Sequence, residues 1–145
     1  VVCALALPHV SDLRPVFAEF ARVLRPGGRL ITSDIHWQSL YLGGIASAVD
    51  GDGIPKRMPA GRYLPSDYLA AALPLGLQVT AMAEPRWPRE VISGGPVADR
   101  YAGAAVTAAY ENTPAAIIWE FRLQPPGGRP AERTAPGGPG SPMPR

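Results

Sequence analysis

Residues 1–37, VVCALALPHVSDLRPVFAEFARVLRPGGRLITSDIHW, decide the fold of this chain. Residues 1–7 are almost purely apolar, as in a strand that is buried on both faces of a parallel sheet. Residues 13–24 repeat large apolar side chains at helical spacing, and residues 29–33 form a second apolar run. The pattern predicts a strand, a helix and a second strand parallel to the first.

The ends of the predicted helix are marked by residues with known capping behaviour. Asp12 is the expected N-cap, because Pro15 then lies in the first turn, where its missing N–H is not needed. Residues 25–28, Arg-Pro-Gly-Gly, are expected to end the helix. Glu19 and Arg22 are three residues apart and should form an exposed ion pair.

Two segments of this stretch resemble a known family. ALALPHVSD at residues 4–12 and EFARVLRPGGRLITSD at residues 19–34 resemble the class I methyltransferases that use S-adenosyl-L-methionine, of the small-molecule, methyltransferase domain 11-like type. The resemblance implies an α/β fold: the C-terminal half of a Rossmann-like methyltransferase sheet, strands four to seven with flanking helices. Pro8 departs from the family pattern, which often has a histidine at this position, and a proline removes one backbone donor at the end of the first strand.

The chain after residue 37 is more interrupted. Residues 40–64 are irregular, and either cover the methyl acceptor, as the resemblance implies, or form a disordered insertion. The elements expected further on are a helix over 68–73 capped by Ser66-Asp67, a strand over 77–82, a helix over 98–110 and a strand over 115–123. The family pattern implies that this last strand runs antiparallel between the fifth and sixth.

Composition divides the chain into one domain, residues 1–123, and a Pro/Gly-rich tail, residues 124–145, that is expected to be disordered. Within the tail, Arg129, Arg133 and Arg145 outnumber Glu132, which gives a charge of +2, the formal net charge of the whole chain. The domain is therefore near neutral, and neither nucleic acid nor a membrane is an expected partner.

The cysteine content, the lack of targeting signals and the first residue of the chain lead to three more expectations. Cys3 is the single cysteine, so a buried thiol is expected rather than a disulfide or thiolate metal cluster. No signal peptide or long apolar run is present, which predicts a cytoplasmic protein. The chain begins with Val1 inside a strand, so we expect a longer protein whose N-terminal half completes the domain.

Polar residues follow both strands of the predicted unit. His9, Asp34 and His36 come just after the strands, at the edge where open α/β sheets bind ligands. His9 and His36 are the candidate catalytic residues, because a histidine there can accept a proton from the acceptor. Alternatively, His9 only closes the strand, Asp34 caps the next element and His36 is a loop residue. A metal site at Asp34-x-His36 is a weaker alternative, since a third ligand is missing.

The resemblance implies further roles. Ala4 and Leu5 would contact the methionine part of S-adenosyl-L-methionine through their backbone, although they could equally be plain core. Asp34 and Trp37 are the candidate substrate-binding residues. The pair Gly27-Gly28 follows a helix rather than opening one, so it is not a cofactor loop.

The sequence therefore predicts a methyltransferase that acts on an O, N or C atom of a small molecule. Residues 1–145 contain neither the glycine-rich turn nor the ribose-binding acidic residue of the family, so this chain alone is expected to be inactive. A second hypothesis is a non-catalytic remnant or interaction module of the same fold. A third is a piece of a Rossmann-like dehydrogenase, which the RVLRPGG wording at residues 22–28 disfavours.

Overall fold

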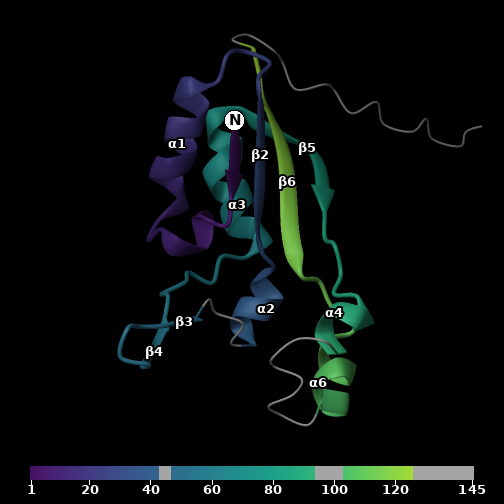
Figure 1. Ribbon diagram of the computed structural model, residues 1–145. Coiled ribbons are helices and arrows are strands. Elements are labelled where there is room, and N and C mark those ends of the chain that lie inside the picture. The colour runs from purple at the N-terminus through teal and green to yellow at the C-terminus, as the bar shows by residue number, and fades with distance from the viewer. Residues whose placement is uncertain (43–46, 94–102, 126–145) are drawn as a thin grey trace, which may run out of the picture.

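The computed structural model describes residues 1–42, 47–93 and 103–125, which form a sheet with helices on one face and at one end (Figure 1). The strands, in chain order, are β1 Val2–Ala4, β2 Arg29–Ile35, β3 Ser47–Val49, β4 Pro55–Arg57, β5 Leu77–Ala83 and β6 Ala116–Leu123. The helices are η1 Leu7–His9, α1 Leu13–Val23, α2 Trp37–Tyr41, α3 Pro65–Ala72, η2 Leu73–Leu75, α4 Arg89–Ser93 and α6 Gly103–Tyr110.

The unit β1–α1–β2 forms as predicted. Asp12 is the N-cap of α1, and its carboxylate accepts a hydrogen bond of 2.9 Å from the Arg14 backbone N–H. Glu19 and Arg22 form the expected ion pair at 2.8 Å. β1 and β2 are parallel, with Cys3 opposite Thr32. The prediction of a parallel strand pair joined by a helix is confirmed.

The main sheet has the strand order β1-β2-β6-β5. β6 is antiparallel to both of its neighbours, so the last strand in sequence lies inside the sheet. It is joined to the turn before β2, where the Leu123 carbonyl accepts from the Gly27 N–H at 2.8 Å. Gly27 has φ = 75°, a conformation that glycine adopts without strain. The expected α/β class and the insertion of the last strand are both confirmed.

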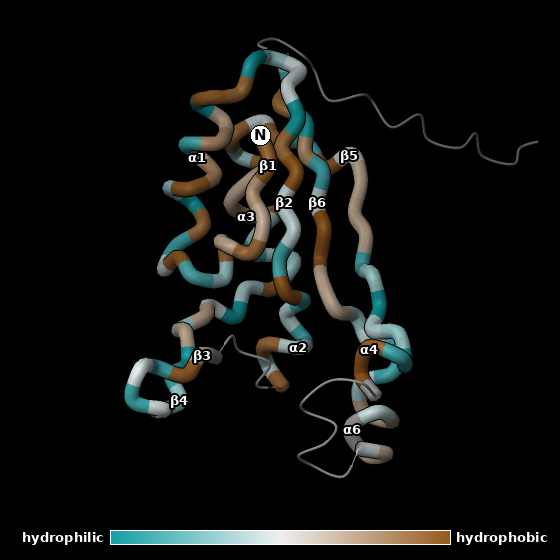
Figure 2. Tube along the Cα trace, in the orientation of Figure 1, coloured by the Kyte–Doolittle hydropathy of each residue, from teal (hydrophilic) through white to brown (hydrophobic). Residues whose placement is uncertain are grey.

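The core lies on one face of this sheet, under α1 and α3. Phe17 of α1 contacts Phe121 of β6, with ring centroids 5.7 Å apart, and Tyr68 of α3 stacks on Trp119 at 6.2 Å. All four side chains are buried, and Figure 2 marks hydrophobic residues along the strands and along α1. This burial is the main stabilising contribution in the described part of the chain.

The opposite face of the sheet carries no helix in the described part of the chain (Figure 1). Val2 is 74% exposed, Ala4 is exposed, and Ile31 and Ile118 are only half-buried. The expectation that residues 1–7 form a strand buried on both faces is therefore wrong. The strand ends at Ala4, because the chain turns into η1 at Leu7, and only one sheet face is covered.

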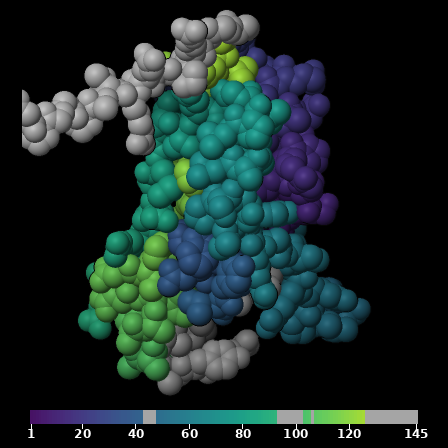
Figure 3. All heavy atoms as spheres, turned by 180° about the vertical axis from the view of Figure 1, so that it is seen from behind, coloured from purple at the N-terminus to yellow at the C-terminus, as the bar shows by residue number. Residues whose placement is uncertain are grey.

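Several elements gather where β1 and β2 end (Figure 1). α2 follows β2 directly, and a β3–β4 hairpin projects from this end of the molecule, as seen from behind in Figure 3. Residues 40–64 were expected to be irregular, but they contain this short hairpin. Asp50 closes its turn by accepting from the Ile54 N–H at 2.8 Å.

The start of α3 differs from the expected one. α3 starts at Pro65 rather than at a Ser66-Asp67 cap, because Asp67 instead accepts a 2.7 Å bond from the Leu64 N–H. The helix expected over 98–110 is described from Gly103, and 98–102 lie outside the described residues. Almost all of the expected tail, residues 126–145, lies outside them too. Among the described helices, none is long and apolar enough to span a bilayer.

The free edge of β1 predicts self-association. It joins unpaired backbone groups to exposed Val2 and Leu5, a combination that favours pairing with another chain. We expect light scattering to detect oligomers at concentrations on the order of 100 μM. Val2→Lys should restore a monomer, whereas Val23→Lys, which places the same charge on exposed helix surface, should not. A monomeric wild-type chain would contradict this prediction.

Candidate functional site

The candidate site lies at the carboxyl edge of the parallel pair β1–β2. β1 ends at Ala4, and Leu5 follows with φ = 53°, an uncommon conformation for a residue other than glycine. The Leu5 N–H still donates to the Ser33 carbonyl at 2.8 Å, which holds the chain beside β2. Both Ala4 and Leu5 are exposed, so the predicted cofactor contacts lie at an open edge.

His9 ends η1 and is exposed, with one ring nitrogen bound to the segment before α3. Its Nδ1 lies 2.8 Å from the Pro59 carbonyl oxygen. A carbonyl only accepts hydrogen bonds, so Nδ1 carries the proton in this contact. In the neutral ring, Nε2 is then left with its lone pair, which is the form a proton acceptor requires.

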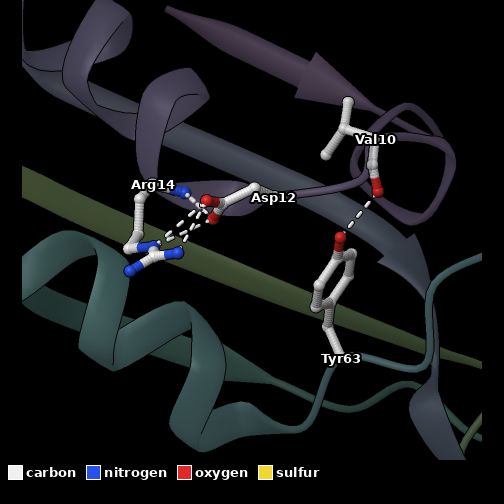
Figure 4. Close-up of polar contacts among 4 residues, drawn as sticks. All are labelled: Val10, Asp12, Arg14 and Tyr63. Carbon is white, nitrogen blue, oxygen red and sulfur yellow. Dashed lines mark hydrogen bonds and ion pairs between the residues drawn. The ribbon is translucent and has the colours of Figure 1, made fainter.

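A cavity of about 320 Å³ lies between η1 and the segment that precedes α3. Its lining residues are Pro8, His9, Val10, Ser11, Pro59, Ala60, Gly61 and Tyr63. The Tyr63 hydroxyl donates to the Val10 carbonyl at 2.6 Å (Figure 4), and the Gly61 N–H donates to the Pro8 carbonyl at 2.5 Å. Together with the His9 bond, these contacts join two walls that are far apart in sequence.

Asp34 is fully buried near the end of β2. The Tyr68 hydroxyl lies 3.3 Å from Asp34 Oδ2, and within the described part of the chain Oδ1 has no hydrogen-bond partner. Burial raises the pKa of Asp34, and the Tyr68 hydroxyl offsets part of that rise. Burial likewise raises the pKa of Tyr68, with the Asp34 charge adding to the rise. Burial therefore makes the Asp34 carboxyl harder to ionise in the folded chain than in water.

His36 is also buried, and both of its ring nitrogens have partners. Nδ1 accepts from the Gln38 N–H at 3.2 Å, so His36 is the N-cap of α2. Nε2 lies 3.0 Å from Glu84 Oε1, just beyond the end of β5. The ring of Trp37 packs beside it, with centroids 5.3 Å apart. His36 thus connects the ends of β2 and β5.

The structure brings some of the predicted residues together and separates others. His9 is close enough to Asp34 that its charge acts to lower the pKa of that carboxyl, whereas His36 and Trp37 belong to the α2 side of the edge. Sequence reasoning missed Tyr63 and Glu84, whose partners are 53 and 48 residues away. Within the described ranges, no three His, Cys, Asp or Glu side chains are grouped to hold a metal ion.

Comparisons with known proteins agree with this geometry. A family model described as "Methyltransferase domain" matches residues 1–32, which run from β1 into β2. No curated protein sequence matches the chain. The structure is similar to an S-adenosylmethionine dependent methyltransferase from Mesorhizobium loti, at 18% identity and a TM-score of 0.54, covering 83% of this chain and 60% of that one.

A second similar structure is a complex between the Haloferax volcanii Trm112 methyltransferase activator and a candidate methyltransferase, with a TM-score of 0.60 at 14% identity. It covers 89% of this chain and 55% of that one. This chain has the Rossmann-like methyltransferase fold. It spans less than two thirds of the length of these structures, so it corresponds to part of the methyltransferase fold.

The fold implies S-adenosyl-L-methionine as the methyl donor, and the described residues are compatible with binding its methionine end. Exposed backbone at Ala4 and Leu5 is available at the carboxyl edge for the methionine part of S-adenosyl-L-methionine. Asp34, near the end of β2, is buried against Tyr68 and is not open to a ligand.

Proposed function

We propose that this chain is part of an S-adenosyl-L-methionine-dependent methyltransferase that acts on a small molecule. The observation that carries this proposal is the carboxyl edge of β1–β2, where exposed Leu5 holds a positive φ beside the cavity-lining residue His9. Strained backbone of this kind is concentrated at functional sites. The match of residues 1–32 to a methyltransferase family model supports the same conclusion.

The predicted site residues would have different roles in methyl transfer. S-adenosyl-L-methionine supplies an activated methyl group when it is bound. Ala4 and Leu5 would hold its methionine end through backbone contacts, and His9 would face the acceptor. Asp34, which is buried against Tyr68, would support the acceptor site, and Trp37 would contact the acceptor from the α2 side. For His36, the two satisfied ring nitrogens favour a positioning role over proton transfer.

The test combines sequence and binding. The coding region upstream of Val1 should encode a strand followed by a G-x-G-x-G-like turn. The product that carries both segments should bind S-adenosylhomocysteine in calorimetric titration, whereas residues 1–145 alone should give no measurable heat. If the longer product also fails to bind, or if no such turn is encoded, the proposal is wrong.

The two histidines provide a second measurement on that longer product. His9→Ala should lower turnover by about 10²–10⁴-fold with cofactor affinity unchanged, as expected for loss of a proton acceptor. His36→Ala should lower turnover and thermal stability together, because it removes the cap of α2 and the bond to Glu84. Equal loss of turnover and cofactor affinity in His9→Ala would argue that His9 only supports the fold.

The open sheet face favours a second candidate function. A face with exposed Val2 and half-buried Ile31 and Ile118 suits an interaction module whose partner supplies the rest of the sheet. Co-purification of residues 1–145 with a separate polypeptide that carries a glycine-rich turn would support this candidate. A chain that purifies alone, while the longer product is active, would exclude it.

A further inference from the structure

We propose that the cavity between η1 and residues 59–63 binds the methyl acceptor as an uncharged molecule, through a hydroxyl group that donates to His9 Nε2. This inference rests on the proposed function and deepens it, because it selects one class of acceptor. It predicts methylation of a hydroxyl oxygen rather than of a carboxylate oxygen or of an ammonium-bearing substrate. The assignment depends on which polar groups of the cavity are already engaged.

The donors of the cavity wall are largely used within the protein. The N–H of His9 Nδ1 donates to Pro59, the Tyr63 hydroxyl donates to Val10, and the Gly61 N–H donates to Pro8. What remains toward a ligand is the lone pair of His9 Nε2, the Tyr63 oxygen and the Ser11 hydroxyl. His9 Nε2 and the Tyr63 oxygen accept from a ligand, whereas the Ser11 hydroxyl can donate or accept, so a ligand hydroxyl, which also does both, matches this set.

The lining of the cavity offers no counter-charge to a charged ligand. No residue that lines it carries a formal charge when His9 is neutral. The nearest carboxylate in sequence, Asp12, is bound by Arg14 at 2.9 Å (Figure 4). Burial raises the pKa of Tyr63, and the charges of Asp12 and Asp67 add to the rise, so this wall stays neutral. A charged ligand would leave water without gaining a counter-charge from the lining, so an uncharged acceptor is preferred.

The proton balance of the step is simple. As the acceptor oxygen bonds the methyl carbon, the hydroxyl proton passes to His9 Nε2, and the electron pair of the broken C–S bond stays on sulfur. One positive charge leaves the sulfonium and one appears on the imidazolium. The Nδ1–H bond to Pro59 is kept in both forms of His9, so the ring need not move to accept the proton.

The first measurement needs no activity. In the 145-residue chain, ¹⁵N chemical shifts should identify the neutral tautomer of His9 as protonated at Nδ1. Binding is then followed by chemical shift changes of the lining residues with 4-methylphenol, 4-methylbenzoate and 4-methylbenzylammonium as matched probes. We expect 4-methylphenol to bind with a dissociation constant on the order of millimolar, and the charged probes to bind more weakly.

A pair of glycine substitutions tests the location. A Cβ at Gly61 would lie 2.6 Å from the Tyr63 ring, so Gly61→Ala should displace this wall and weaken 4-methylphenol binding by about tenfold. At Gly51, in the exposed hairpin turn, a Cβ meets nothing within 4 Å, so Gly51→Ala should leave binding unchanged. Equal effects of both substitutions would overturn the assignment of the probe to this cavity.

The possible outcomes separate this inference from the function on which it rests. An Nε2-protonated neutral tautomer, or charged probes that bind as well as 4-methylphenol, would overturn the hydroxyl assignment even if the longer product binds S-adenosylhomocysteine. Selective binding of 4-methylphenol would support the hydroxyl site. If the longer product then failed to bind S-adenosylhomocysteine, the methyltransferase function alone would be wrong.

Discussion

Replacing Phe17 by Ala should remove a large part of the free energy of unfolding of this chain. The Phe17 ring is fully buried and makes edge-on contacts with Phe20, Tyr68 and Phe121, at centroid distances of 5.7, 6.2 and 5.7 Å. Truncating such a side chain costs about 3–5 kcal/mol in free energy of unfolding, against a total of about 5–15 kcal/mol for a typical domain.

Urea unfolding followed by circular dichroism measures this loss, and the Val2→Lys background removes any contribution from self-association. Val23→Ala is the matched control, because Val23 lies on the same helix and is 52% exposed. It should change stability by less than about 0.5 kcal/mol. A Phe17→Ala protein within about 1 kcal/mol of the control would mean that the α1 core is not formed as described.

The second large effect concerns pH. Burial raises the pKa of Asp34 above its ordinary value, so the folded state prefers the protonated carboxyl. Below the unfolded-state pKa both states hold the proton, and the associated stability is fully present. As pH rises from there toward the raised folded-state pKa, the unfolded state loses its proton first and the free energy of unfolding falls. If the folded and unfolded pKa values differ by one, the stability lost is about 1.4 kcal/mol.

Asp34→Asn keeps the shape of the neutral carboxyl but removes its ionisation. We expect the variant to match the wild type near the ordinary pKa of Asp and to become more stable than it as pH rises. Tyr68→Phe should widen this gap, since the Tyr68 hydroxyl acts to lower the Asp34 pKa. His9 on η1, Cys3 on β1 and Tyr68 on α3 also interact electrostatically with this carboxyl or its partner. A constant difference across pH would contradict the prediction.

Local sequence signals predicted the first strand–helix–strand unit well. The Asp12 cap, the Arg-Pro-Gly-Gly stop at residues 25–28 and the apolar spacing between them act within a few residues of one another. Resemblance to the methyltransferases supplied the position of β6, which no local pattern reveals. The cap of α3 was assigned wrongly, because Asp67 is equally suited to the third helical position, where it bonds back to Leu64.

The candidate site was predicted only in outline. Strand ends in the sequence indicated His9, Asp34 and His36, since parallel strands bring their carboxyl ends together. The sequence could not indicate that Glu84 would bind His36 or that Tyr63 would close a wall beside His9, because these pairings depend on tertiary packing. The same limit explains why His9 and His36 looked equivalent in sequence but differ in the availability of a ring nitrogen.

The position of β6 has a consequence for biosynthesis. β2 and β5 are both made before β6, yet each forms its long ladder with β6, so neither can complete its pairing until residues 116–123 have left the ribosome. Until then the nascent chain exposes the unpaired edges of two apolar strands, a state that invites aggregation and chaperone binding. A ribosome that stalls before Ala116 would release a product with two unpaired strands rather than a chain that lacks only its last one.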